Sequence, residues 1–250
     1  MRLPDFLIGG APRSGTTWLY HLLARHPDVY MAEPVQPEPK FFLVDELYAC
    51  GLEWYSRTWF RDVPEGRICG EKSTNYFESE RAAQRIATDL PGVRMVFVLR
   101  DPVERAWSNY LWSRMNGLED ETFERALELE QQRERSLAPD LRYSRPHAYL
   151  SRGLYAQMLR PWFAMLPRGS ILCLRCEDIA ARPQDVAEQL HRFLGLPPRG
   201  TDVMGLGVIN PSAREQGELA AETRRRLRTY YAEPNSRLAE LLGPGFEVWS

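Results

Sequence analysis

The stretch from residue 6 to residue 25 constrains the fold more than any other part of the chain. It begins with a short apolar run, Phe6-Leu7-Ile8-Gly9, passes through a glycine-containing turn and enters a segment, 16–25, whose apolar side chains recur at helical spacing. His26-Pro27 then ends the helix, because proline disfavours helical backbone in the residue before it. A strand, a tight turn and a helix in this order form the repeating unit of α/β proteins with parallel sheets.

Further strands and helices are expected along the chain. Residues 95–99 form a continuous apolar run that is typical of a buried parallel strand, and Pro102 opens the helical pattern that follows. We also predict strands at 67–70 and 171–174, a helix at 184–194 that ends at Gly195, and C-terminal helical packing over 222–242 that is interrupted at Pro234. The predicted fold class is therefore α/β, with a central, mainly parallel sheet flanked by helices.

Length and composition predict how the chain is organised. With 250 residues, of which 44% are hydrophobic and 26% charged, the chain is long enough for one sizeable core, and we expect a single domain over residues 1–250. Residues 116–152 differ from the rest because they are rich in glutamate and arginine. We interpret this segment as a solvated helical excursion that borders the mouth of an active site.

Charge and cysteine content argue against several classes of partner. The net charge is −2 and the basic residues are scattered, which predicts neither a nucleic-acid partner nor a membrane partner. No apolar run is long enough for a signal peptide or a membrane span. Of the four cysteines, Cys173 and Cys176 lie in or beside an apolar run, so buried thiols are expected and no metal site. These features predict a cytoplasmic protein.

The turn after the first predicted strand, Gly10-Ala11-Pro12-Arg13-Ser14-Gly15-Thr16-Thr17, has the glycine spacing of a phosphate-binding loop, GxxxxGK[ST]. In such a loop, backbone N–H groups and the helix N-terminus hold an anion. Thr16 stands where the motif has lysine. Because that lysine contacts the β and γ phosphates of a nucleoside triphosphate, its replacement argues against ATP or GTP. Arg13 and the hydroxyls at 14, 16 and 17 still favour an anionic ligand.

Lysine is almost absent from the chain. Only two of its 32 basic residues, Lys40 and Lys72, are lysines, and the other 30 are arginines. A lysine that is kept in such a chain indicates a need for a compact, mobile ammonium group, which a planar guanidinium does not provide.

Two segments resemble those of a known enzyme family. The run from Ala11 to Trp18 resembles the 5′-phosphosulfate loop of the sulfotransferases that use 3′-phosphoadenosine 5′-phosphosulfate (PAPS). The run from Val98 to Tyr110 is similar to the 3′-phosphate motif of that family, in which an arginine at a strand end and a serine on the next helix, here Arg100 and Ser108, hold the phosphate. An arginine at the carboxyl end of a parallel strand faces the crevice where α/β proteins bind ligands, and guanidinium suits phosphate.

Two further segments are similar to a branch of this family, the heparan sulfate N- and O-sulfotransferases and related bacterial enzymes. Glu38-Pro39-Lys40-Phe41-Phe42 resembles an acidic segment whose glutamate is the catalytic base. The run from Gly70 to Phe77 resembles a segment whose lysine, here Lys72, contacts the reacting sulfuryl group. Both lysines of the chain therefore fall within segments that sulfuryl transfer uses.

The resemblance implies a complete set of site residues. The catalytic residues would be Glu38, Lys72, Lys40 and Arg13. The nucleotide would be bound by Arg13, Ser14, Gly15, Thr16, Thr17, Trp18, Arg100, Ser108, Tyr155 and Arg214. The chain departs from the branch at three places: Arg13 replaces a lysine, Lys40 replaces a histidine found in some members, and Ser212-Ala213-Arg214 replaces a Lys-Gly-Arg clamp.

The implied reaction is transfer of a sulfuryl group from PAPS to a hydroxyl or amine of a glycan or small metabolite, without a metal. The alternatives are a small-molecule kinase with a P-loop, and a non-catalytic sensor of adenosine 3′,5′-bisphosphate (PAP). Thr16 argues against the kinase, and the set Glu38, Lys40 and Lys72 argues against the sensor. The four histidines show no ligand spacing, although His147 lies in the segment expected near the acceptor. The sequence leaves the oligomeric state open.

Overall fold

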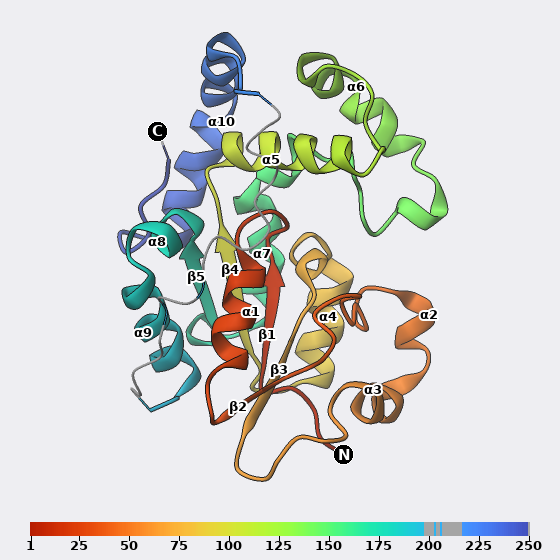
Figure 1. The fold of residues 1–250 in the computed structure, drawn as a ribbon, viewed down its shortest axis with the longest axis vertical. Coiled ribbons are helices and arrows are strands. Elements are labelled where there is room, and N and C mark those ends of the chain that lie inside the picture. The colour runs from red at the N-terminus through yellow and green to blue at the C-terminus, as the bar shows by residue number, and fades with distance from the viewer. Residues whose placement is uncertain (198–202, 204–205, 207–216, 250) are drawn as a thin grey trace. The chain divides into compact units, whose positions relative to one another are not determined.

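The computed structural model describes residues 1–197, 203, 206 and 217–249 (Figure 1). The chain divides into two compact units. Unit 1 comprises residues 1–99 and 161–210, and unit 2 comprises residues 100–160 and 211–250. Each unit has its own buried apolar cluster.

A five-stranded parallel sheet forms the centre of unit 1. Its strands are β1 (Phe6–Gly10), β2 (Val29–Met31), β3 (Ile68–Lys72), β4 (Arg94–Leu99) and β5 (Ile171–Arg175), in the order β2-β3-β1-β4-β5. The predicted α/β class is confirmed, and each of the four predicted strands lies within one or two residues of an observed one. Strand β2 was not predicted from the sequence, and it has only three residues. Strand β1 lies between β3 and β4, so its carboxyl end is a point where the chain connections diverge, and α/β proteins bind ligands at such points.

Helices cover both faces of this sheet (Figure 1). Those of unit 1 are α1 (Thr16–Ala24), α2 (Asp45–Tyr48), α3 (Gly51–Trp59), α4 (Glu80–Asp89), α8 (Cys176–Ala181) and α9 (Pro183–Leu194), with short 3-10 helices η1 (Thr74–Glu78) and η4 (Arg168–Ser170). Apolar side chains of α1 and α9 pack on alternate residues of the central strands, among them Ile8 and Val96. This double coverage explains why β1 and residues 95–99 of β4 are continuous apolar runs.

The opposite face of the sheet is held by an aromatic cluster. The Phe97 ring lies 5.3 Å from that of Phe77 and 5.1 Å from that of Trp162, measured between ring centroids. The indole N–H of Trp162 donates to the Phe77 carbonyl (3.2 Å).

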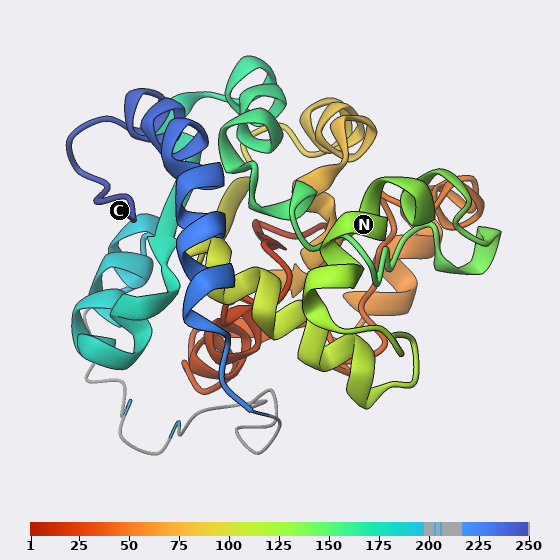
Figure 2. The same ribbon diagram turned by 90° about the horizontal axis from the view of Figure 1, so that it is seen from above.

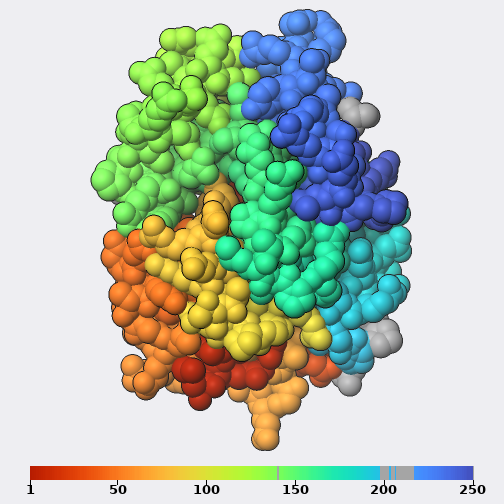
Figure 3. Space-filling view, turned by 180° about the vertical axis from the view of Figure 1, so that it is seen from behind, coloured from red at the N-terminus to blue at the C-terminus, as the bar shows by residue number. Residues whose placement is uncertain are grey.

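An ion pair connects α4 to α2 in the same unit. Arg85 of α4 pairs with Asp45 of α2 at 2.6 Å. Figure 3 shows the surface of α4, in yellow, against the orange surface of the α2 and α3 segment.

Unit 2 is built from helices. It contains α5 (Pro102–Met115), α6 (Phe123–Arg135), the residues of α7 (Tyr155–Met165) up to Arg160, and α10 (Ala221–Leu242), with 3-10 helices η2 (Pro139–Leu141) and η3 (Ser151–Gly153). Helix α10 runs beside α5 (Figure 2), and their buried side chains share one cluster with Phe123 and Tyr149.

The expected interruption of the C-terminal helix at Pro234 is wrong. Helix α10 continues through Pro234 as far as Leu242. Proline removes one backbone hydrogen bond from a helix, but packing of the flanking turns can override that loss. Tyr231, Asn235 and Leu238 are buried on both sides of the proline, and this packing explains the continuous helix.

The segment 116–152 is helical in part, but the expectation that it is solvated is wrong for two of its glutamates. Glu119 and Glu130 are both buried. Glu119 accepts a hydrogen bond from the Tyr149 hydroxyl (2.7 Å) and pairs with Arg133 (2.6 Å), whereas Glu130 accepts the backbone N–H groups of residues 150 and 151 (2.5 and 2.8 Å). These carboxylates replace water as partners of buried donors, so they are structural parts of unit 2.

Candidate functional site

The loop between β1 and α1 requires glycine at two positions. A side chain at Gly10 would place its Cβ 2.5 Å from the Cβ of Phe77 and 2.6 Å from the Thr74 carbonyl oxygen, which is closer than real atoms approach. Gly15 has a φ of +91° and caps the N-terminus of α1. The two glycines therefore allow the chain to turn tightly from the sheet into the helix, beside the residues that follow β3.

Hydroxyl groups line the start of α1. Ser14 is fully buried, and its Oγ has no hydrogen-bond partner in the described part of the chain. Thr16 is buried and Thr17 half-buried, and Gly15 provides no side-chain cap for the helix. A buried hydroxyl without a partner needs an explanation, and a helix N-terminus attracts anions. The residues of this loop therefore fit a bound phosphate or sulfate group.

Two other predicted nucleotide-binding residues of the loop have different surroundings. Arg13 is half-buried and has a φ of +67°. Trp18 is 5% exposed, lies in the apolar cluster of unit 1 and donates its indole N–H to the Leu206 carbonyl (3.3 Å). Its side chain thus anchors α1 to the core.

Glu38 and Lys72 form an ion pair next to this loop. Lys72 is the last residue of β3, where it pairs in register with Ile8 of β1, and its side chain is 3% exposed. The Lys72 ammonium donates to Oε1 of Glu38. The pair is therefore placed at the carboxyl end of β3, beside the strand that carries the glycine loop.

Thr74 is a further contact of Glu38 that the sequence analysis did not single out. Its backbone N–H donates to Oε2 of Glu38 (3.0 Å), and its hydroxyl lies 3.2 and 3.1 Å from the two carboxylate oxygens. Lys72 and Thr74 together surround the carboxylate with donors and fix its orientation. The available signal was the position of Thr74 two residues after Lys72, within the same motif.

Lys40 contributes to this site through its backbone. It is half-buried with a φ of +49°, and its N–H donates to the Ser73 hydroxyl (2.8 Å). The structure thus brings three of the four predicted catalytic residues, Glu38, Lys40 and Lys72, to residues 72–74.

A second carboxylate, also missed by the sequence analysis, lies next to Lys72 in the chain. Glu71 is fully buried and accepts hydrogen bonds from the hydroxyls of Tyr55 (3.2 Å), Ser73 (2.8 Å) and Tyr76 (2.8 Å). Burial raises the pKa of Glu71 to about 7, an effect that the hydroxyl donors oppose and the charge of Glu38 increases. Because side chains alternate along a strand, Glu71 and Lys72 point to opposite faces of β3.

The other predicted nucleotide-binding residues belong to unit 2. Arg100 directly follows β4, and its carbonyl accepts the Tyr155 hydroxyl (2.7 Å). Ser108 is buried on α5. Helix α5 begins as its sequence predicts, with Asp101 as N-cap and proline in the first turn. Arg214 lies outside the described residues.

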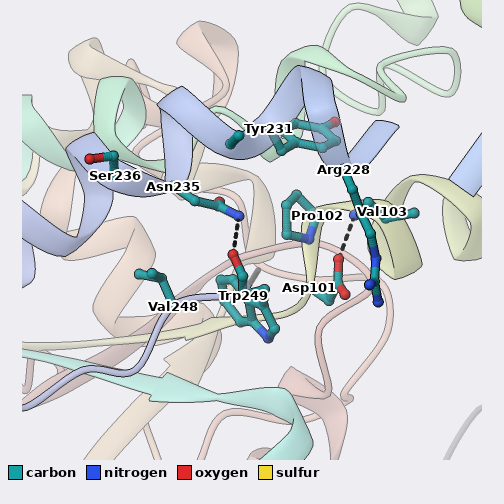
Figure 4. Close-up of a pocket in the computed structure, with 10 residues that line it drawn as sticks. Asp101, Pro102, Val103, Arg228, Tyr231, Asn235, Ser236, Val248 and Trp249 are labelled. Carbon is teal, nitrogen blue, oxygen red and sulfur yellow. Dashed lines mark hydrogen bonds between the residues drawn. The ribbon is translucent and has the colours of Figure 1, made fainter. Parts of the chain in front are cut away.

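Unit 2 also contains a cavity of about 260 Å³ between the start of α5, α10 and the C-terminal segment. Figure 4 shows two bonds that shape it: Asp101 accepts the Val103 N–H (2.8 Å), and the Asn235 amide donates to the Trp249 carbonyl (2.7 Å). Burial raises the pKa of Asp101, which lines this cavity.

No helix in the described part of the chain is both long and apolar enough to cross a membrane. Within the same residues, no cluster of three or more histidine, cysteine, aspartate or glutamate side chains is placed to hold a metal ion.

Comparison with known proteins agrees with the expectation from the motifs. The family model described as the sulfotransferase domain matches residues 3–205. Heparan sulfate glucosamine 3-O-sulfotransferase 3A1 of Mus musculus is 30% identical over 98% of this chain, which spans 64% of that enzyme's length. A sulfotransferase from Alicyclobacillus acidocaldarius has the same fold, with a TM-score of 0.79, 26% identity and coverage of 97% of this chain and 96% of the other.

A more distant structure, mouse sulfotransferase SULT7A1 complexed with PAP, shares the fold with a TM-score of 0.60 and 15% identity, covering 96% of this chain and 88% of the other. The match of the family model extends over most of the chain, from before β1 to beyond α9. This chain belongs to the sulfotransferase family, and among its relatives are a heparan sulfate sulfotransferase and a bacterial sulfotransferase.

Proposed function

We propose that this chain transfers a sulfuryl group from PAPS to a hydroxyl or amine of a glycan or small metabolite, with Glu38 as the general base. The observation that carries the proposal is the Glu38–Lys72 pair, held by Thr74 at the carboxyl end of β3 and next to the glycine loop. A carboxylate and an ammonium at this edge of a parallel sheet are suited to removing a proton and stabilising a transferring anion.

The residues of the site have defined roles in this reaction. PAPS supplies the sulfuryl group and leaves as PAP. The acceptor oxygen or nitrogen forms the new bond to sulfur as the bond from sulfur to the 5′-phosphate oxygen breaks, and the acceptor proton passes to Glu38. Lys72 and Arg13 stabilise the negative charge on the sulfuryl group and the leaving oxygen, and Lys40 acts near the acceptor.

Nucleotide binding is assigned to two sets of residues. In unit 1, Ser14, Gly15, Thr16, Thr17 and Trp18 belong to the loop and helix start that bind the 5′-phosphosulfate. The unpartnered hydroxyl of Ser14 supports this assignment. In unit 2, Arg100 and Ser108 are assigned to the 3′-phosphate, Tyr155 to the nucleotide, and Arg214 to a clamp on the nucleotide.

The proposal retains three further expectations from the sequence: a single sulfotransferase domain over residues 1–250, a cytoplasmic location, and no nucleic-acid or membrane partner. No metal takes part in the proposed transfer. The distant relative that is complexed with PAP supports the choice of donor.

The test is formation of PAP from PAPS in the presence of hydroxyl and amine acceptors, with Glu38→Gln as the variant. We expect Glu38→Gln to lower turnover by roughly 10²–10⁴-fold, the usual contribution of a positioned general base, and to leave PAP binding intact. Glu33→Gln, an exposed neighbour on the same segment, is the matched control and should keep full turnover. If Glu38→Gln retained nearly the wild-type rate, the assignment of the base would be wrong.

A further inference from the structure

We propose that Glu71 is a positioning residue for sulfuryl transfer, whose carboxylate holds the backbone of residues 40–42 and so keeps Glu38 in contact with Lys72 and Thr74. The inference rests on the proposed function and deepens it, because it assigns a role to a buried group that does not itself meet the acceptor.

Three hydroxyl donors surround Glu71. The carboxylate accepts from Tyr55 of α3, and from Ser73 and Tyr76 after β3. All four side chains are buried. A carboxylate can only accept hydrogen bonds, so its presence makes each of the three hydroxyls donate its proton inward.

The direction of those hydrogen bonds determines what else the hydroxyls can contact. When a hydroxyl donates to Glu71, its lone pairs are free to accept from elsewhere. The Ser73 hydroxyl accepts the Lys40 N–H (2.8 Å), and the Tyr76 hydroxyl accepts the Phe42 N–H (3.3 Å). Two chains of hydrogen bonds thus run from the carboxylate through a hydroxyl to the backbone.

Tyr55, which carries the third hydroxyl, contacts Phe41, the residue between Lys40 and Phe42. The Tyr55 ring stacks on the Phe41 ring with centroids 4.3 Å apart and an angle of 14° between the planes. Glu71 is therefore connected to residues 40, 41 and 42 in turn. Glu38 lies two residues before this anchored stretch, so the anchor limits where its carboxylate can lie.

Electrostatics connect the same groups. Among the residues that the structure describes, the charged or titratable groups that face Glu71 are Tyr55, Tyr76 and, at longer range, Glu38. Protonation of Glu71 would turn an acceptor into a donor and remove one of the three inward hydrogen bonds. Because its pKa is raised to about 7, this change falls in the neutral range, and we expect the Glu38–Lys72 contact to weaken as the pH falls through that value.

The scarcity of lysine makes this contact measurable without an acceptor. Protein labelled with ¹³C at the ε carbon of lysine gives two NMR signals, one for Lys40 and one for Lys72, and Lys40→Arg identifies the second. The chemical shift of the Lys72 signal in Glu38→Gln is the reference value for a lysine without the ion pair. In the wild type we expect the Lys72 signal to inflect near pH 7. In Glu71→Gln, the inflection should be absent and the signal should move toward its position in Glu38→Gln.

Two further variants make the test specific. Tyr55→Phe removes a donor that stabilises the Glu71 carboxylate, so the inflection should move to higher pH, and this variant keeps the proposal testable if Glu71→Gln does not fold. Glu119→Gln removes another buried carboxylate that accepts a tyrosine hydroxyl, and it should leave the Lys72 signal unchanged.

The outcomes separate this inference from the proposed function. A Lys72 signal that is identical in wild type and Glu71→Gln at every pH, or an inflection that does not move in Tyr55→Phe, would overturn the positioning role. Failure of the protein to bind PAP would instead overturn the proposed function and leave the lysine result as it stands.

Discussion

Three donor groups from two neighbouring residues fix the carboxylate of Glu38. Lys72 supplies the ammonium, and Thr74 supplies both its backbone N–H and its hydroxyl. A base that is already oriented loses little freedom when the acceptor arrives, and correct geometry is a large part of enzymatic rate enhancement. Thr74 is therefore the residue through which the orientation of Glu38 can be changed without altering its charge.

We expect Thr74→Val to lower turnover roughly tenfold, because one donor to Glu38 is lost while the backbone N–H remains. Thr74→Ser keeps the hydroxyl and should restore most of the rate. Steady-state formation of PAP from PAPS measures both variants. Equal rates for Thr74→Val and the wild type would show that the hydroxyl does not orient the base.

Substitution of Ser14 should change the affinity for PAP without lowering the stability of the protein. Its buried hydroxyl lacks a partner in the described residues, so Ser14→Ala removes an unsatisfied group and should leave the free energy of unfolding unchanged or slightly higher. The same variant should weaken PAP binding roughly tenfold, since a hydrogen bond to a charged phosphate is lost. Denaturant unfolding and calorimetric titration with PAP measure the two effects. Unchanged PAP affinity would contradict the assignment of Ser14 to the nucleotide site.

The connection from β1 to α1 depends on its close approach to the residues after β3. Gly10→Ala would place a Cβ within 2.6 Å of both Phe77 and the Thr74 carbonyl, so the loop must shift. We expect a loss of about 1–3 kcal/mol in the free energy of unfolding, the usual cost of overpacking. Gly169→Ala faces open space and is the control. Urea denaturation of both variants checks the difference, and equal stabilities would contradict the described packing.

The elements that sequence predicted best are those with an unambiguous local signal. Strand β1 and residues 95–99 of β4 are apolar because helices cover both faces of the sheet, and α5 starts with an aspartate cap and a proline. Strand β2 was missed because three residues carry too little pattern to distinguish a strand from a loop. Helix α10 passes through Pro234 because burial on both sides outweighs a local preference.

Only part of the candidate site was predictable from the sequence. Glu38, Lys40 and Lys72 could be found from motif likeness and lysine scarcity, and the structure brings them to one place. Thr74 and Glu71 lie in the same motif as Lys72, but their roles could not be predicted, because these depend on which hydroxyls and amides the fold brings to a carboxylate. The burial of Glu119 and Glu130 could not be predicted either. A charged segment predicts exposure, yet both carboxylates are buried and accept hydrogen bonds from specific donors.

At the scale of the whole molecule, Glu71 links stability to pH. Its pKa rises from an ordinary 4.5 to about 7 on folding, so between these values the native state binds more protons than the unfolded state. Stability must then fall as the pH rises from about 4.5 to 7. We expect the wild type to lose on the order of 2 kcal/mol relative to Glu71→Gln between pH 5 and pH 8. Urea denaturation across this range measures it, and a constant difference would refute the raised pKa.

Binding of the sulfotransferase donor can be tested by a thermal shift with PAP, ADP and ATP, each with and without Mg²⁺. A ligand that binds the native state raises the melting temperature by mass action. We predict strong stabilisation by PAP that does not depend on Mg²⁺, and a smaller shift with ADP or ATP. Stabilisation by ATP with Mg²⁺ and none by PAP would contradict the account and favour a small-molecule kinase.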